Sequence, residues 1–352
     1  MINVLITCIG GYYGIDTIKA LKSDTEIDIK IIGADADPTV VSRHFVDDFF
    51  CLPNADIDPQ MFITNIYEIC DKNNVDIIIP GADEEAYALS KSKDMFENIG
   101  VKCAVQDASI MNIIGNKLSF FKKMEELNIE VPKFAGIYSY HDLIKNADRL
   151  GFPDRRIILK PSVGRGSRGL MVIDDSISDP TEGHESRGYW LGDIKSAVSH
   201  LKFQQDSLEV ADLGLLAMEY LPGDIYDVDC VAKEGLALAI IPRKRLWDTP
   251  FSRGVEGHVI EENKFILEIT NKIIKALSLG YVFDCDFGTH SNGHPGVLEI
   301  NPRWSGSVAA SLASGVNIPS LIVKVLMGIE FNEINPVYGN KIFPTTRMGF
   351  ID

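Results

Sequence analysis

Basic residues are scarce in this chain. Its 352 residues include 34 Lys and Arg against 50 Asp and Glu, which gives a formal net charge of −16 at pH 7. A general nucleic-acid binder needs a basic surface for the phosphates, so the charge balance argues against that class of protein. A local cationic pocket for a nucleotide stays compatible with this balance. We therefore expect no nucleic-acid partner.

Paired cysteines and long apolar runs are also missing. The six cysteines are scattered, mostly in apolar stretches, and the absence of a C-x-x-C pair argues against a zinc site. Buried free thiols are typical of a reducing compartment. The apolar runs are all far shorter than the ~18 residues of a membrane span. The start predicts a strand without the basic region of a signal peptide. We expect a cytoplasmic protein with two to three domains and no membrane partner.

The first third of the chain alternates predicted strands and helices. A strand over 2–9 leads into a Gly-Gly-x-x-Gly turn, and a helix and a second strand lead to Asp35. Such βαβ units predict a parallel, Rossmann-like sheet. Asp35 lies roughly where a Rossmann fold binds the ribose of NAD. A dinucleotide site is therefore one alternative, although the glycines lack the G-x-G-x-x-G spacing.

Acidic residues follow the strand predicted over 75–79. Glu84 and Glu85 lie just beyond its carboxyl end, where open α/β sheets bind ligands. Glu84 or Glu85 is therefore a candidate contact for a substrate ammonium, and Glu84 is the one we assign. The alternative is structural, because acids in a first helical turn interact favourably with the helix dipole.

Residues 156–173 predict two strands joined by a glycine-rich loop. Lys160 ends the first, apolar strand, where a lysine is costly to bury without an anionic partner. The loop offers backbone and side-chain donors for nucleotide phosphates, although it lacks the P-loop pattern. The polar stretch 174–192 after it predicts a surface loop. The candidate phosphate-binding residues of the glycine loop are Ser162, Gly164, Arg165, Gly166, Ser167 and Gly169.

Two further stretches carry candidate ligand contacts. Residues 215–230 predict two strands around the turn Leu221-Pro222-Gly223. The backbone groups of this hinge could pair with an adenine edge, and a plain hairpin is the alternative. Arg243 follows a strand predicted over 235–241. It is a candidate contact for a substrate carboxylate, with a solvated strand end as the alternative.

The stretch Val297–Ser307 combines metal-ligand and phosphate-binding chemistry. Alternate strand residues share a face, so Glu299, Asn301 and Arg303 point the same way. Carboxylate and amide oxygens suit Mg²⁺, and an arginine suits a phosphate. The small residues Ser305 and Gly306 would let a ligand approach closely. The alternative is a buried strand that ends in a turn.

Five stretches, taken in order, resemble the ATP-grasp superfamily and, within it, the carbamoyl-phosphate-synthase-like ligases. They are Asn116-Lys117, Ile158–Pro161 with the glycine loop, Met218–Gly223, Asp284–Phe287 and Leu298–Arg303. The resemblance covers nearly the whole chain. It implies an α/β fold, α+β in the grasp part, with a Rossmann-like pre-ATP-grasp domain at 1–108. A central and lid subdomain would follow at 109–215, and a C-terminal subdomain with the metal site at 216–352.

The resemblance also implies residue roles. Lys117 and Lys160 would contact the ATP phosphates, and Lys160 and Arg303 would act in catalysis. The metal, Mg²⁺ or Mn²⁺, would bind Asp286, Glu299 and Asn301. Adenine and ribose contacts would come from Met218, Glu219, Tyr220, Leu221 and Asp224. Many relatives carry glutamates at the positions of Met218 and Ile225, which leaves the ribose contact open. The implied substrate contacts are Glu84, Arg243, Arg303, Ser305 and Gly306.

The function implied by this resemblance is ATP-dependent ligation. The enzyme would activate a small-molecule carboxylate as an acyl phosphate and join it to an amine or amino acid. One alternative is a kinase-type or carbamoyl-phosphate-synthase-like enzyme that releases a phosphorylated product. Another is a nucleotide-binding module without catalysis. A homodimer is the expectation from the family.

Overall fold

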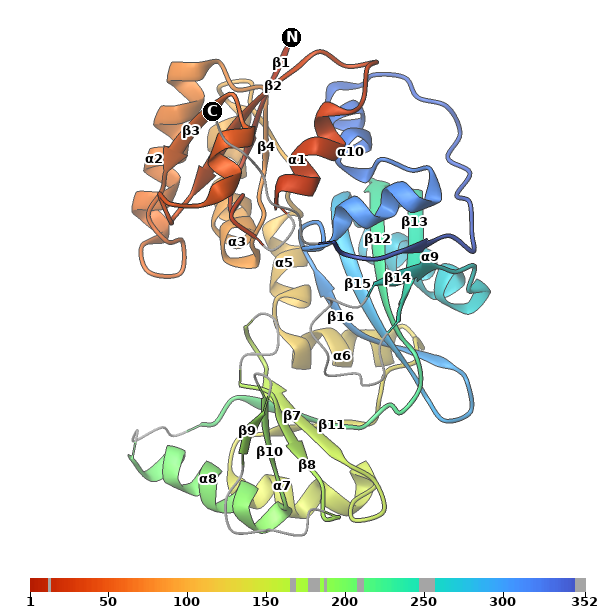
Figure 1. Cartoon of the computed structure of the whole chain (residues 1–352). Coiled ribbons are helices and arrows are strands. Elements are labelled where there is room, and N and C mark those ends of the chain that lie inside the picture. Colours follow the sequence, from red (N-terminus) through yellow and green to blue (C-terminus); the bar gives the residue numbers. More distant parts are fainter. Residues whose placement is uncertain are drawn as a thin grey trace.

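The computed structural model describes residues 1–11, 14–164, 169–176, 184–186, 189–207, 212–246 and 257–345. Three β-sheets organise these residues, one with five strands and two with six. Figure 1 shows the five-stranded sheet and the C-terminal sheet side by side, with the remaining sheet in a lobe below them. Among the described helices, none is long and apolar enough by itself to span a membrane. One pair bent by 97°, Val308–Ser314 with Ile318–Met327, would suffice by length and composition.

The N-terminal sheet is parallel and confirms the predicted Rossmann-like alternation. Its strand order is β3-β2-β1-β4-β5, so the chain moves outward from β1 and then returns to its other side. Open α/β sheets bind ligands at such a switch point. The strands are β1 (Ile2–Ile6), β2 (Ile29–Asp35), β3 (Asp48–Cys51), β4 (Ile77–Ile79) and β5 (Lys102–Cys103). The helices are α1 (Gly14–Lys22), α2 (Pro59–Asn73), α3 (Asp83–Lys91) and α4 (Lys93–Glu97), and η1 (Val41–Phe45) is a 3₁₀ turn.

The turn after β1 does not support the dinucleotide alternative. The Asp35 carboxylate accepts hydrogen bonds from the backbone N–H groups of Gly10, at 2.7 Å, and Asp37, at 2.9 Å. Each carboxylate oxygen of Asp35 thus binds a backbone N–H of its own domain, which gives the side chain a structural role. A Cβ on Gly14 would lie 1.8 Å from the Ile9 carbonyl oxygen, so this glycine is required for close packing.

The middle of the chain forms α5 (Ala108–Ile114), α6 (Lys117–Glu126) and the lower lobe (Figure 1). The sheet of this lobe has the order β6-β11-β7-β8-β10-β9. Its strands are β6 (Phe134–Ile137), β7 (Ile157–Pro161), β8 (Met171–Ile173), β9 (His184–Ser186), β10 (Tyr189–Gly192) and β11 (Leu215–Glu219). Its helical segments are α7 (Tyr140–Ala147), η2 (Asp148–Leu150) and α8 (Ile194–Ser207).

Two expectations for this region change. The polar stretch 174–192 was expected as a loop, yet Tyr189–Gly192 pairs in parallel with β8. The expected domain border between residues 215 and 216 falls within β11, which belongs wholly to the lower lobe and pairs with β6 and β7. A border after Glu219 agrees better with this pairing.

The C-terminal sheet is antiparallel, with the order β16-β15-β12-β13-β14-β17. Alternate residues of its long strands enter the core, among them Val228, Cys230, Phe283 and Cys285. The residues between them lie on the other face and carry the charges of the site. The strands are β12 (Ile225–Lys233), β13 (Leu236–Arg245), β14 (His258–Ile260), β15 (Tyr281–Thr289), β16 (Pro295–Asn301) and β17 (Lys341–Ile342). The helical segments are α9 (Lys264–Leu277), η3 (Val308–Ser314) and α10 (Ile318–Met327).

Candidate active site

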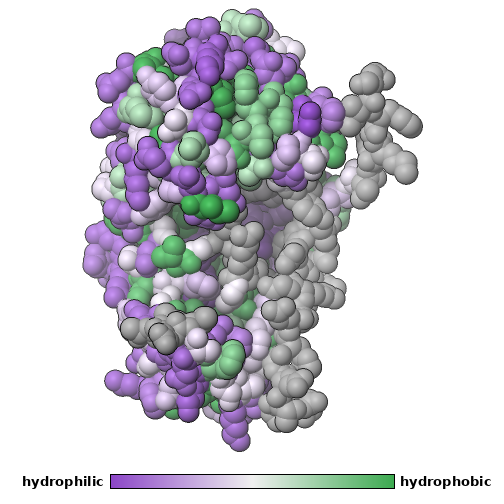
Figure 2. All heavy atoms as spheres, turned by 90° about the vertical axis from the view of Figure 1, so that its left-hand side faces the viewer, coloured by the Kyte–Doolittle hydropathy of each residue, from purple (hydrophilic) through white to green (hydrophobic). Residues whose placement is uncertain are grey.

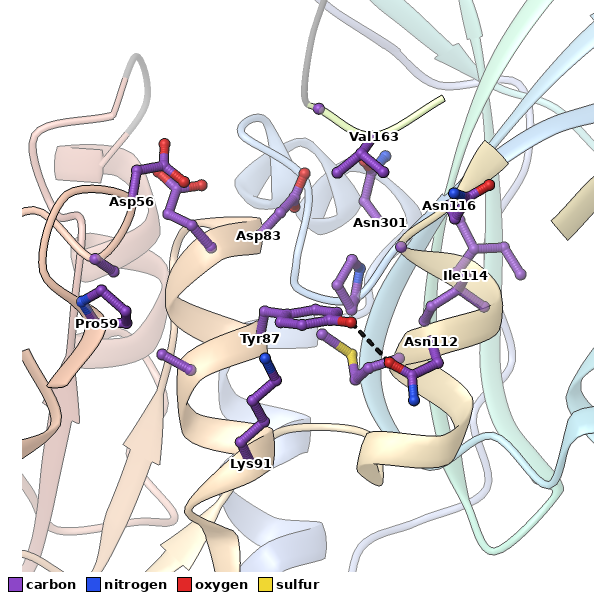
Figure 3. A pocket seen from close by; sticks show the side chains of 18 of the residues that line it. Asp56, Pro59, Asp83, Tyr87, Lys91, Asn112, Ile114, Asn116, Val163 and Asn301 are labelled. Carbon is purple, nitrogen blue, oxygen red and sulfur yellow. Dashed lines mark hydrogen bonds between the residues drawn. The ribbon is translucent and has the colours of Figure 1, made fainter. Parts of the chain in front are cut away.

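A cavity of about 870 Å³ lies where the three parts of the molecule meet. Its walls come from α2 and α3 of the N-terminal part, from α5 and the start of α6, from the end of β7 with Val163 and Gly164, and from the end of β16. Figure 2 shows a recess between the upper and lower parts of the molecule, with both hydrophilic and hydrophobic residues at its rim. Figure 3 shows Asp83 and Asn301 approaching one side of the cavity from different elements. Predicted site residues among its lining are Glu84, Lys117, Gly164, Glu299 and Asn301.

Polar residues form two rows across β12, β15 and β16. The strand register places Asp227, Asp286 and Glu299 in one row and Asp229, Asp284 and Asn301 in the other. Because alternate strand residues share a face, both rows lie on the same side of the sheet. The structure therefore brings together the three residues predicted as metal ligands.

Two further acids join these predicted ligands. One carboxylate oxygen each from Asp227, Asp284 and Asp286 lies within 4.8 Å of the other two. Burial and the neighbouring carboxylates of Asp227 and Asp229 raise the pKa of Asp284 to about 8. Sequence reasoning did not include Asp227 or Asp284 among the ligands. The alternating Asp-Val-Asp and Asp-Cys-Asp patterns were the signal for both.

The side-chain oxygen atoms of these residues suit a divalent cation. In the described part of the chain, the buried Oδ1 atoms of Asp284 and Asp286 have no hydrogen-bond partner. The nearest cation to Asp286 Oδ1 is Arg245 Nη2, at 3.5 Å. Asn301 Nδ2 donates to Asp284 Oδ2 at 3.2 Å, which leaves the amide oxygen of Asn301 for another partner. Oxygen ligands of this kind are those that Mg²⁺ prefers.

Two lysines converge on Glu299. Lys117 Nζ lies 3.3 Å and Lys160 Nζ 3.7 Å from Glu299 Oε2. Burial opposes ionisation of Glu299, but the two ammonium groups prevail and lower its pKa to about 2. Lys117 Nζ also donates to the carbonyl oxygen of Gly164 at 2.6 Å, which ties it to the glycine loop. Two cations thus lie together where phosphates were expected.

The glycine loop is described in part. Ser162 is buried, and its carbonyl oxygen accepts from the Lys117 N–H at 2.7 Å. Gly164 and Gly169 have φ values of +132° and +71°, which favour glycine. The predicted contacts Arg165, Gly166 and Ser167 lie outside the described residues.

Arg303 links the C-terminal sheet to the N-terminal one. Its Nε lies 3.0 Å from Asp83 Oδ1, and its Nη1 donates to the Trp304 carbonyl oxygen at 3.0 Å. Asp83 is the first residue of α3, whose next residue, Glu84, lines the cavity. The guanidinium therefore lies at the junction between the acid rows and the N-terminal wall of the cavity.

Arg243 occupies a different environment from the one expected. Its side chain is fully buried, with Nε 2.7 Å from Asp229 Oδ2. Nη2 donates to Ser305 Oγ at 2.9 Å and Nη1 to Ser307 Oγ at 3.0 Å, while Ser305 Oγ donates to Asp229 Oδ1 at 2.7 Å. This closed network does not support direct substrate contact by Arg243 or Ser305. Gly306, in contrast, is exposed.

A second network supports the row that contains Asp286. The Arg245 guanidinium forms several hydrogen bonds to Asp227, and His258 Nε2 lies 2.8 Å from Asp227 Oδ2. His258 had no expected role. Arg245 and His258 thus both contact Asp227.

The predicted adenine segment lies apart from the cavity lining. Met218 and Leu221 are buried, and Glu219 Oε1 accepts from the Lys133 N–H at 2.8 Å. The guanidinium carbon of Arg156 lies over the Tyr220 ring, 5.6 Å from the ring centre. The exposed Asp224 is 3.5 Å from Lys244 Nζ. The strand register aligns Met218 with Ile158, two residues before Lys160.

Comparison with known proteins gives two family matches. Residues 4–104 match the PylC-like N-terminal domain, and residues 212–345 match the ATP-grasp family in the biosynthetic pathway with Ter operon. The chain is 24% identical to the carbamoyl phosphate synthase large chain of Clostridium botulinum, over 94% of this chain. It is 26% identical to that of Thermoanaerobacter pseudethanolicus, also over 94% of this chain. It spans 28% of the length of each of these relatives.

Solved structures share the fold. Biotin carboxylase from Campylobacter jejuni aligns with a TM-score of 0.67 at 16% identity, over 94% of this chain and 72% of that one. L-amino acid ligase from Bacillus licheniformis aligns with a TM-score of 0.67 at 15% identity, over 96% and 78% of the two chains. The family matches and this shared fold agree with the resemblance in the motifs. Residues 212–345 thus match an ATP-grasp family, and the chain as a whole resembles the carbamoyl-phosphate-synthase-like ligases.

Proposed function

We propose that this chain is an ATP-dependent carboxylate–amine ligase. The observation that carries the proposal is the convergence of Lys117 and Lys160 on Glu299, in the same row as Asp286 and beside a cavity. Such a site combines cations for phosphates with oxygen ligands for a metal. Phosphoryl transfer depends mainly on positioning and charge neutralisation, which this set of residues can supply.

Asp286, Glu299 and Asn301 would hold Mg²⁺. The bound metal would neutralise charge on the transferred phosphate. Two observations on the described residues support this assignment: Asp286 Oδ1 accepts no hydrogen bond, and Asn301 donates through Nδ2, which leaves its amide oxygen to face a metal. When ATP binds, Lys117 and Lys160 would exchange Glu299 for phosphate oxygens. Nucleotide binding would thus free the Glu299 carboxylate for the metal.

The reaction proceeds in two steps, formation of an acyl phosphate and its reaction with the amine. A carboxylate oxygen attacks the γ-phosphorus, the bond to the β–γ bridging oxygen breaks, and ADP leaves with the electron pair. The nitrogen of a neutral amine then attacks the carbonyl carbon of the acyl phosphate. The bond to the phosphate oxygen breaks, and inorganic phosphate carries away the proton lost by nitrogen. Arg303, beside the acid rows, would stabilise the negative charge of the transferred group.

Each of the three candidate activities predicts a different requirement for ADP release. A ligase needs the acid and the amine together, and a kinase-type enzyme needs the acid alone. A nucleotide-binding module without catalysis would form no ADP under either condition. The proposed ligase does not need an enzyme nucleophile, because the acyl phosphate is formed directly from ATP.

The test is ADP release from Mg-ATP with pools of carboxylates and amines, each pool also omitted in turn. We expect turnover only when both pools are present. Glu299→Gln should lower the rate on the order of 100-fold, because it removes a metal ligand and the partner of two lysines. Glu268→Gln, on the exposed side of α9, is the matched control. Wild-type turnover by Glu299→Gln would contradict the metal assignment, and turnover without amine would favour the kinase.

A further inference from the structure

We propose that the part of the cavity formed by α2, α3 and α5 binds the amine substrate, and that this substrate carries an anionic group remote from its amine. The inference rests on the proposed function and specifies its substrate class. The cavity is continuous from Glu299 and Asn301 to the α2–α3 wall. An amine bound along that wall would therefore point toward the site of acyl transfer.

One face of α3 supplies the long wall of this part of the cavity. Glu84, Tyr87 and Lys91 follow one another at helical spacing, and all three line the cavity. Residues spaced by three or four positions lie one above the other on a helix. At 1.5 Å per residue, the seven positions from Glu84 to Lys91 span about 10 Å along the axis.

The two ends of this wall carry opposite charges. Figure 3 shows Asp83 at the end near Asn301 and Val163, Asp56 across the start of α3 from them, and Lys91 on the opposite side of the Tyr87 ring. Asp83 contacts Arg303 through Nε at 3.0 Å, so the acidic end adjoins the expected position of the acyl phosphate. A hydrogen-bond donor such as an amine is favoured at that end, and an anionic group at the Lys91 end.

Lys91 is available for such an anion. Its Nζ lies 4.7 Å from the centre of the Tyr87 ring, and it forms no salt bridge with any carboxylate that the structure describes. The Tyr87 hydroxyl donates to Asn112 Oδ1 at 2.7 Å, which fixes the ring beneath the ammonium. The lysine is thus held at the cavity wall by an aromatic face and not by an acid.

The spacing of the charges limits the length of the substrate. The α-amine and α-carboxylate of one amino acid are separated by a single carbon and cannot span about 10 Å, even when the reach of the side chains shortens that distance. An ω-amino acid or a short peptide can. Ile63, Met111 and Ile114 supply apolar surface in the same cavity, against which the methylene groups of such a chain can pack.

The probes are 6-aminohexanoate, its amide 6-aminohexanamide, and glycine. Each is titrated into the wild-type protein with MgADP, and each is assayed as the amine in ATP-dependent ADP release. We expect 6-aminohexanoate to bind about tenfold more tightly than the other two, as one added charge-assisted contact predicts. Equal binding of the three probes, or no binding of any, would overturn the inference.

Substitutions at Lys91 test the anion contact. Lys91→Glu and Lys91→Gln should raise the KM for 6-aminohexanoate about tenfold, abolish the preference over the amide, and leave the KM for ATP unchanged. Lys72→Glu is the control, because Lys72 is 69% exposed on α2 and outside the cavity lining. Turnover with a KM that Lys91→Glu does not change would overturn the pocket assignment alone. Binding that depends on Lys91 without amine-dependent ADP release would contradict the ligase alone.

Discussion

Arg243 and Asp229 form a salt bridge that is closed to solvent. Arg243 Nε lies 2.7 Å from Asp229 Oδ2, and the two side chains are 0% and 1% exposed. Hydroxyl groups of Ser305 and Ser307 accept two more hydrogen bonds from the guanidinium. Burying two charges costs a large desolvation energy, so the pair is weak evidence for net stability. Together with the two serine contacts, the salt bridge does hold the segment after β16 against β12 and β13.

Breaking this pair should destabilise the protein. Arg243→Met leaves Asp229 buried without its cation, so the free energy of unfolding should fall by about 3–5 kcal/mol. The double variant Arg243→Met/Asp229→Leu removes both charges and should recover most of that loss. Urea denaturation of the three proteins measures the difference. A double variant less stable than Arg243→Met would contradict this explanation.

The burial of Glu85 should make stability depend on pH. Burial, together with the Glu84 and Asp35 carboxylates, raises its pKa from 4.5 to about 7, although Thr7 Oγ1 donates to it at 2.7 Å. Between these values the folded protein retains a proton that the unfolded chain releases. Stability therefore falls as pH rises through this window, by about 3 kcal/mol in all.

Glu85→Gln should remove this pH dependence. The variant is expected to be more stable than the wild-type protein at about pH 8 and to have a flatter profile from about pH 5 upward. Urea midpoints across that range measure the effect. Glu97→Gln, an exposed position, should follow the wild-type profile. Parallel profiles for Glu85→Gln and the wild-type protein would exclude Glu85 as the source.

The sequence predicts features that depend on local patterns. Alternation along one strand is sufficient to place Glu299 and Asn301 on the same face. In the structure they do lie on one face of β16, opposite Asp286 and Asp284 of β15. The alternating aspartates of β12 carried the same kind of signal. Whether Asp227 lies beside Asp286 depends on the register between two strands far apart in the chain. That register is not readable from either strand alone.

The buried environment of Arg243 could not be predicted from the sequence. A cation after an apolar strand looks the same in the sequence whether it reaches solvent or a buried acid. Asp229 comes from the neighbouring strand and Ser305 from the segment after β16. The pairing of β10 with β8 was missed for a similar reason, since a stretch that is polar overall can still supply a strand when the rest of the fold provides partner strands.

Gly306 allows a test of substrate contact with little effect on the fold. A Cβ at this exposed position would have no neighbour within 4 Å, so Gly306→Ala should change stability by less than about 0.5 kcal/mol. If Gly306 faces a substrate, the added methyl group should raise that substrate's KM severalfold. Gly280→Ala is the control, because its Cβ would meet only Glu234 N, at 3.8 Å. Unchanged kinetics in Gly306→Ala would remove this residue from the site.

Lys160 should bind the nucleotide through its charge. It lies at the end of β7, 3.7 Å from Glu299 Oε2, and burial lowers its pKa. Lys160→Met keeps most of the side-chain volume and removes the ammonium, so the Kd for Mg-ATP should rise about 10–100-fold, the loss of one charge-assisted hydrogen bond. Equilibrium titration with Mg-ATP measures the change, with the exposed Lys195→Met on α8 as control. Since Lys117 would still hold Glu299, the variant should stay folded. A Kd equal to that of the control would therefore mean that Lys160 pairs with Glu299 but does not contact the phosphates.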